Sequence, residues 1–193
     1  MSIPAGWCRA VCLFTAIALA GLAADLLTKH WVFQALGMPG EYRADVVELN
    51  SVYWIWQDIV GFQTSLNTGA LFGIGAGQST VLITLSLLFL VGIIGYTLLW
   101  AWRSLFLSAI LGMITAGICG NLYDRLAWHG LTYPNGEPIH AVRDWILCMI
   151  GTFPWPNFNI ADSLLVCSVL LLLFHELLQG TGAGQGTTKE PGM

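Results

Sequence analysis

The stretch TVLITLSLLFLVGIIGYTLLWAW, Thr80–Trp102, contains no charged residue and would be apolar around the whole circumference of a helix. A helix of a soluble protein needs a polar outer face, whereas a helix that crosses a membrane needs about 20 largely apolar residues. The composition of the whole chain also favours a membrane protein, because only 9% of its 193 residues are charged, against about 25% in soluble domains. We therefore predict that this stretch spans a membrane.

Three further stretches have the same character, at residues 10–29, 104–123 and 159–178. Together with 80–102 they predict four spans in a single membrane domain, residues 1–178. The first stretch also fits a cleaved signal peptide, since Arg9 precedes an apolar run that ends in small residues. Asp25 and Lys29, directly beyond the run, favour a retained span. The Gly/Thr-rich tail 179–193 is predicted to be disordered.

The segments between the spans have a different composition. Residues 37–72 are rich in Val, Ile, Tyr and Trp, which indicates short strands and a small sheet on one face of the membrane. The segment 124–158 begins with a turn-rich loop, and residues 141–151 predict a short amphipathic helix or strand. The predicted fold class is thus a mainly α membrane protein with four transmembrane helices and a small β-sheet.

The polar motifs gather at one end of the predicted spans. Four crossings bring the ends of the first and third spans to the same face as the starts of the second and fourth. Those places hold, in chain order, Asp25 with Lys29, LNTGALFG (66–73), GNLYDR (120–125) and FNIADS (158–163). The orientation stays open, because three basic residues lie at the opposite face and four at the polar face.

Two aspartates near this face suit acid/base chemistry. Asp162 and Asp144 could each be an ordinary helix cap, and Asp124 could form a local ion pair with Arg125. Carboxylates at a membrane-spanning segment are nevertheless functional candidates. Two carboxyl groups that share one proton can activate water and then protonate an amine, which is peptide hydrolysis without a nucleophilic side chain.

Other chemistries find little support in the sequence. GxSxG is absent, and GIGAGQST (73–80) has Gln78 where a phosphate-binding loop needs lysine. His140 and Asp144 are two possible metal ligands, fewer than a metal site needs, so no metal and no cofactor are predicted. A net charge of -4 offers no basic face for nucleic acid.

Five motifs occur in a characteristic order: DLLTK (25–29), LNTGALFG, GNLYDRL (120–126), VRDWI (142–146) and FNIADS. Together they resemble the lipoprotein signal peptidase family, signal peptidase II, over about residues 25–178. The resemblance implies a metal-free aspartyl endopeptidase of the bacterial cytoplasmic membrane, with an extracytoplasmic β-cradle at residues 37–72 and both termini cytoplasmic. It implies cleavage of prolipoproteins just before their diacylglyceryl-modified cysteine, with membrane lipids as further partners, and we expect a monomer.

The resemblance also assigns roles to residues. It makes Asp144 and Asp162 the catalytic pair, near the extracytoplasmic face. It places five residues around the substrate or the pair: Asn67, Gly69, Asn121, Arg125 and Asn159. It gives structural or orienting roles to Asp25, Lys29 and Asp124.

This sequence departs from the family pattern at a few places. Arg143 precedes the expected catalytic Asp144 where the family usually has an apolar residue, and an adjacent cation could lower the pKa of Asp144. Leu71 replaces a usually small residue, and the loop 131–140 is longer than usual. Two other classes of function remain open from the residues alone: a small transporter or channel subunit that binds ions with its carboxylates, and a membrane scaffold.

Overall fold

Four helices and a four-stranded sheet make up the part of the chain that a computed structural model describes, residues 6–39, 52–69, 78–100 and 104–183. The helices are α1 (Trp7–Leu36), α2 (Ser79–Leu99), α3 (Leu105–Arg125) and α4 (Ile160–Ala183). All four are long and apolar enough to cross a membrane. The four predicted spans are therefore confirmed as helices.

Two of these helices are longer than predicted. α1 runs from Trp7 to Leu36, beyond the predicted stretch 10–29 at both ends, so that Lys29 lies well inside the helix and not at its end. α4 continues to Ala183, past the predicted start of the tail at residue 179. The remainder of that tail, 184–193, lies outside the described residues, as does Leu71.

The third helix is the centre of the bundle. α3 packs against each of the other three helices, and its apolar segment is far more buried than theirs. Small residues allow this close packing: a Cβ added at Gly117 would meet the carbonyl oxygen of Ala161 on α4 at 2.7 Å. A Cβ at Gly112 would meet the carbonyl oxygen of Phe14 on α1, also at 2.7 Å. Small residues serve the same purpose at helix contacts in membranes generally.

The sheet has the antiparallel order β1-β2-β3-β4, formed by β1 (Tyr53–Trp56), β2 (Val60–Asn67), β3 (Val142–Ile150) and β4 (Phe153–Phe158). The prediction of strands in 37–72 is confirmed for the described residues 52–69, whereas 40–51 and 70–72 lie outside them. Of the two options for residues 141–151, helix or strand, the structure has the strand β3.

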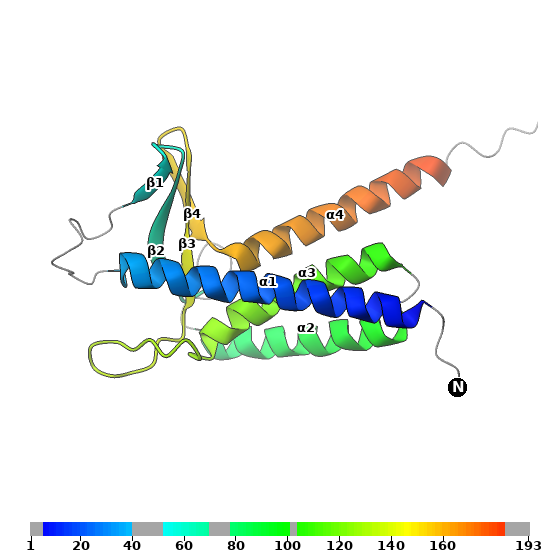
Figure 1. The fold of residues 1–193 in the computed structure, drawn as a ribbon, viewed down its shortest axis with the longest axis horizontal. Coiled ribbons are helices and arrows are strands. Elements are labelled where there is room, and N and C mark those ends of the chain that lie inside the picture. Colours follow the sequence, from blue (N-terminus) through cyan, green and yellow to red (C-terminus); the bar gives the residue numbers. More distant parts are fainter. Residues whose placement is uncertain (1–5, 40–51, 70–77, 101–103, 184–193) are drawn as a thin grey trace, which may run out of the picture.

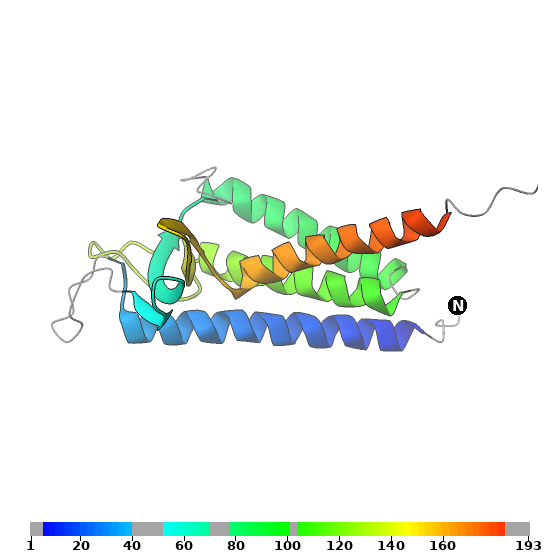
Figure 2. The same cartoon turned by 90° about the horizontal axis from the view of Figure 1, so that it is seen from above.

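The sheet stands at one end of the bundle, at a steep angle to the helices, and α1 begins at the other end (Figure 1). The view turned by 90° shows the same separation, with α1 along one side and α2 along the other (Figure 2). α1 and α3 end beside the sheet, and α2 and α4 begin there. The predicted convergence of the polar motifs at one end is confirmed for the described residues, while residues 70–73 of LNTGALFG lie outside them.

Candidate active site

A buried ionic cluster joins α1, the end of α3 and the start of β3. Lys29 Nζ lies 2.7 Å from Asp25 Oδ2 and 3.1 Å from Asp124 Oδ2, and all three side chains are fully buried. Arg143 donates from Nε and one terminal nitrogen to Asp124 Oδ1 at 3.0 and 2.8 Å, and its backbone N–H donates to Asp124 Oδ2 at 2.9 Å. Buried charges require such partners, because an unpaired one is costly in an apolar interior.

The N-terminus of α4 is fixed from two directions. Asn159 precedes the helix, and its Oδ1 accepts the backbone N–H of Asp162 at 2.9 Å, which makes Asn159 the N-cap. Asp162 Oδ2 accepts the backbone N–H of Asn159 at 3.3 Å in return. Asp25 Oδ1 accepts the backbone N–H of Ala161 at 2.9 Å, so that α1 holds the first turn of α4.

Two side-chain amides connect the two candidate catalytic carboxyl groups. Asn159 Nδ2 donates to Asp144 Oδ1 at 2.6 Å and to Asn121 Oδ1 at 3.1 Å. Asn121 Nδ2 donates to Asp162 Oδ1 at 2.7 Å, and Asn121 Oδ1 also accepts from Lys29 Nζ at 3.1 Å. Asp144 on β3 and Asp162 on α4 are therefore held in one hydrogen-bond network although they lie 18 positions apart in the chain.

Asp144 is 1% exposed. Its burial and the negative charge of Asp162 raise the pKa of Asp144 to about 7, against the opposing effects of the Asn159 hydrogen bond, the charge of Lys29 and a hydrogen bond with Asn67. Burial and a like charge both penalise the ionised form of a carboxyl group. Asp144 is thus about half protonated at pH 7, which allows it to act as a general acid near neutral pH.

The end of β2 closes another side of the site. Asn67 is its last residue, and Asn67 Oδ1 accepts the backbone N–H of Gly69 at 3.0 Å. One terminal nitrogen of Arg125 donates to the carbonyl oxygen of Gly69 at 2.8 Å, which ties this turn to the end of α3. The negative charges of Asp162 and Asp144 both interact electrostatically with the guanidinium of Arg125.

The charges of this site nearly cancel. Four carboxyl groups lie in one network with three basic side chains. Burial lowers the pKa of the nearby His129, which favours the neutral form of that imidazole. One proton retained among the carboxyl groups makes the set neutral, which suits a site with little access to water. The members are Asp25, Asp124, Asp144 and Asp162 with Lys29, Arg125 and Arg143.

The structure brings all ten residues predicted from the resemblance into this network. Two details of the prediction were wrong. The cap of α4 is Asn159 rather than Asp162. Asp124 forms ion pairs with Lys29 and Arg143, neither of which the sequence indicated as its partner. Arg143 was missed as a member of the site, although its position beside Asp144 was the available signal.

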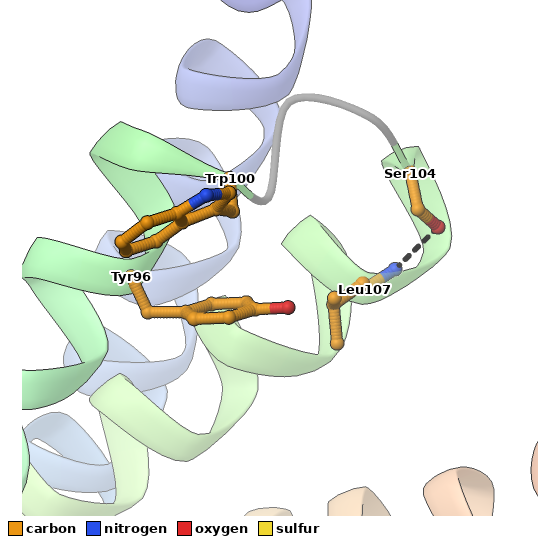
Figure 3. A pocket seen from close by; sticks show the side chains of 4 residues that line it. All are labelled: Tyr96, Trp100, Ser104 and Leu107. Carbon is orange, nitrogen blue, oxygen red and sulfur yellow. Dashed lines mark hydrogen bonds between the residues drawn. The ribbon is translucent and has the colours of Figure 1, made fainter.

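A pocket of about 390 Å³ lies at the opposite end of the bundle, between the end of α2 and the start of α3. Figure 3 shows the rings of Tyr96 and Trp100 on one side and Ser104 with Leu107 on the other. Ser104 Oγ accepts the backbone N–H of Leu107 at 3.2 Å, as an N-cap. The four residues that line this pocket carry no pair of acidic or basic side chains, in contrast to the polar network at the sheet end.

Comparisons with known proteins point to one family. The model of the family described as signal peptidase (SPase) II matches residues 17–178. The chain is 43% identical over 166 residues to a lipoprotein signal peptidase of Rhodopirellula baltica, covering 83% of this chain and 70% of the relative. It is 31% identical to the lipoprotein signal peptidase of Bacillus velezensis, covering 86% of this chain and 94% of that protein. A bacterial membrane enzyme solved by the in meso method at 2.3 Å resolution has the same fold, with a TM-score of 0.71, 23% identity, and coverage of 92% of this chain and 94% of the other.

Proposed function

The chain belongs to the signal peptidase II family, and on that premise we propose that it cleaves the signal peptide from prolipoproteins just before a diacylglyceryl-modified cysteine, with Asp144 and Asp162 as the catalytic pair. Its four apolar helices and its family make it a multi-pass protein of the bacterial inner membrane. The family also favours a peptidase over a transporter or a scaffold.

The linked carboxyl groups are the observation that carries this mechanism. Asn159 and Asn121 hold Asp144 and Asp162 in one network, and the charge of Asp162 helps to raise the pKa of Asp144. Two coupled carboxyl groups with one proton between them are the acid and the base that direct attack by water requires.

In the proposed reaction Asp162 is ionised and takes a proton from water as the water oxygen attacks the scissile carbonyl carbon. Asp144 begins protonated and hydrogen-bonds to the carbonyl oxygen, which stabilises the charge that develops there. The tetrahedral intermediate then collapses, the C–N bond breaks, and the departing amine takes a proton from the pair. The products are the free signal peptide and the lipidated amino terminus, and the pair is left with its original single proton.

The arrangement of the chain supports a topology for this reaction. The sheet and the catalytic pair lie at the end of the bundle opposite the first residues of α1 and the last residues of α4 (Figure 1). We place the sheet end at the extracytoplasmic face, where translocated prolipoproteins expose their lipidated cysteine, and both termini in the cytoplasm. Membrane lipids surround the helices, and the enzyme acts as a monomer.

Substitution of each aspartate by asparagine tests the mechanism. Asp144→Asn and Asp162→Asn retain size and much of the hydrogen bonding but remove the proton that is transferred. Each should lower cleavage of a diacylglyceryl-modified prolipoprotein by about 10²–10⁴-fold. The double variant should be little worse than either single variant, because the two groups act as a unit. The measurement is release of the signal peptide by purified protein in detergent.

Asp58→Asn is the matched control, since Asp58 is exposed in the turn between β1 and β2, where asparagine tolerates the positive φ of 57°. This variant should cleave at the wild-type rate. Near-wild-type cleavage by folded Asp162→Asn would contradict the catalytic assignment. Loss of cleavage in Asp124→Asn with activity retained in Asp144→Asn would show that Asp124 is the true partner.

A further inference from the structure

Arg143 is the one member of the ionic cluster that the family pattern does not predict. Its guanidinium is buried, makes two contacts with Asp124 Oδ1, and lies 6.0 Å from the centre of the Phe33 ring. Arginine presents its donors as a rigid planar fork, which makes such a pair specific in geometry as well as in charge. The pair therefore fixes the position of the strand at the residue before Asp144.

Asp124 holds the same strand through the backbone. Its Oδ2 accepts the Arg143 N–H at 2.9 Å, while Oδ1 accepts the guanidinium. Successive side chains on a strand point to opposite faces, so Arg143 is directed away from Asp144 and toward α3. The charge of Arg143 is matched by Asp124 on that side, and Asp144 keeps a pKa of about 7 despite the adjacent cation.

We propose that Arg143 and Asp124 form a positioning pair that holds the carboxyl group of Asp144 at the correct distance from that of Asp162. The same pair sets the charge balance under which the two aspartates share one proton. The proposal rests on the proposed function. It goes beyond that function because it assigns a role to Arg143 and predicts how the protonation of the pair responds to changes elsewhere in the cluster.

The charge balance gives opposite predictions for the two partners. Arg143→Met keeps most of the aliphatic length but removes a cation, so neutrality requires the cluster to retain a second proton. Asp124→Asn removes an anion, so neutrality no longer requires the shared proton. The double variant Asp124→Asn/Arg143→Met restores the original charge balance.

The charged and titratable groups around Asp144 come from every element packed against it. They are Asp25 and Lys29 on α1, Asp124 and Arg125 on α3, Asp162 on α4, and His129, His140 and Arg143 in or beside the segment that leads into β3.

A pH titration of the purified proteins followed by infrared spectroscopy tests this directly. The carboxylic-acid carbonyl band that is absent from Asp144→Asn identifies the protonated form of Asp144. Its midpoint should move to higher pH in Arg143→Met and to lower pH in Asp124→Asn, each by about one pH unit or more. In Asp124→Asn/Arg143→Met it should return to within a few tenths of a unit of wild type.

The rate of signal-peptide release provides the second readout. Arg143→Met and Asp124→Asn should each lower kcat at pH 7 about 10-fold or more with little change in KM, and their pH profiles should move in the same directions as the infrared midpoints. Arg143→Lys retains the cation but loses the fork. It should keep the wild-type midpoint while kcat falls, which separates the effect of position from the effect of charge.

A purely structural pair would behave differently. Both single variants would then lose folded protein or activity without opposite shifts of the midpoint, and the double variant would be no better than the worse single one. Midpoints that move in the same direction, or a double variant that fails to restore the wild-type midpoint, overturn the proposal. The infrared titration needs no substrate, so failure of the wild type to cleave a prolipoprotein would reject the proposed function and leave this test standing. If Asp124→Asn does not fold, Arg143→Met and Arg143→Lys still decide, because only the first should shift the midpoint.

Discussion

Asp162 is the third residue of α4, and its carboxylate accepts the backbone N–H of the N-cap Asn159 and a side-chain proton of Asn121. Asn159 in turn donates its amide protons to Asp144 and Asn121. The capping of this helix and the proposed catalytic pair thus use the same few atoms. A helix start is a favourable place for a carboxylate, because the helix dipole and the free N–H groups stabilise negative charge there.

At the residue scale the raised pKa of Asp144 predicts a pH-dependent stability. The folded protein keeps the proton of Asp144 up to about pH 7, whereas an unfolded aspartate loses it near pH 4. The folded state therefore binds more protons between these values, and wild-type stability falls as pH rises from about 4 to about 7. Asp144→Asn lacks this loss, so it should gain stability relative to wild type at pH 8, by up to about 4 kcal/mol.

Thermal unfolding in detergent at pH 5 and pH 8 measures this difference. Asp58→Asn, which removes an exposed carboxylate, should follow the wild type at both pH values. A difference between Asp144→Asn and wild type that does not grow with pH would mean that Asp144 is ionised in the folded protein throughout this range.

At the element scale the close packing of α3 decides whether the ionic cluster can form. Gly120 is one residue before Asn121, and a Cβ at this position would collide with the carboxylate of Asp25 and lie 3.2 Å from Ala161 Cβ. The glycine therefore makes room for the carboxylate that anchors the first turn of α4. The motif GNLYDR thus begins with glycine because the Asp25 side chain of α1 approaches this position closely, and not because the chain turns there.

Gly120→Ala should consequently lower cleavage strongly and destabilise the fold by about 1–3 kcal/mol, a typical cost of overpacking a filled interior. Gly92→Ala on α2 is the matched control, because a Cβ there meets nothing within 4 Å. That variant should be as active and as stable as wild type, or slightly more stable, since alanine is the better helix former. The measurements are the rate of signal-peptide release and the thermal midpoint. Equal behaviour of the two variants would show that the Asp25 contact is dispensable.

At the scale of the whole molecule the charged groups are concentrated at one end of an otherwise apolar bundle. α2 and α4 expose leucine, valine and phenylalanine side chains along their length, whereas the carboxyl groups, cations and asparagines of the network meet where the sheet joins the helices. The sheet supplies Asn67, Arg143 and Asp144, Asn159 precedes α4, and the helices supply the other charged members. Neither part forms the site alone.

The site should work without a metal ion. Among the residues that the structure describes, no group of three His, Cys, Asp or Glu side chains is arranged to hold one, and the carboxylates of the network already have Lys, Arg or amide partners. Treatment of the purified enzyme with EDTA, followed by dialysis, should leave signal-peptide release unchanged. Loss of activity that a divalent cation restores would replace the two-aspartate mechanism with a metal-dependent one.

The resemblance to a known family indicated ten residues of the site, whereas the sequence by itself determined the number of spans and the end at which the polar motifs meet. The physical reason is that these features follow from local properties. Apolar length predicts a span, and alternate crossings fix which ends are neighbours. The strands in the described residues 52–69 also followed from their β-branched and aromatic composition, whereas the sequence left 141–151 as either helix or strand.

Only the tertiary structure decided which polar groups are partners. The sequence placed Asp124 beside Arg125 and suggested a local pair, but the end of α3 directs Asp124 toward Lys29 of α1 and Arg143 of β3. In the same way, only the structure shows that Asn159 caps α4 and that Asp25 accepts a backbone N–H from the first turn of that helix. It also shows that Asp144 is buried. Apart from the cap, which joins residues 3 positions apart, these pairings depend on contacts between residues 19 to 136 positions apart. No local pattern in a single sequence encodes the distances that create them.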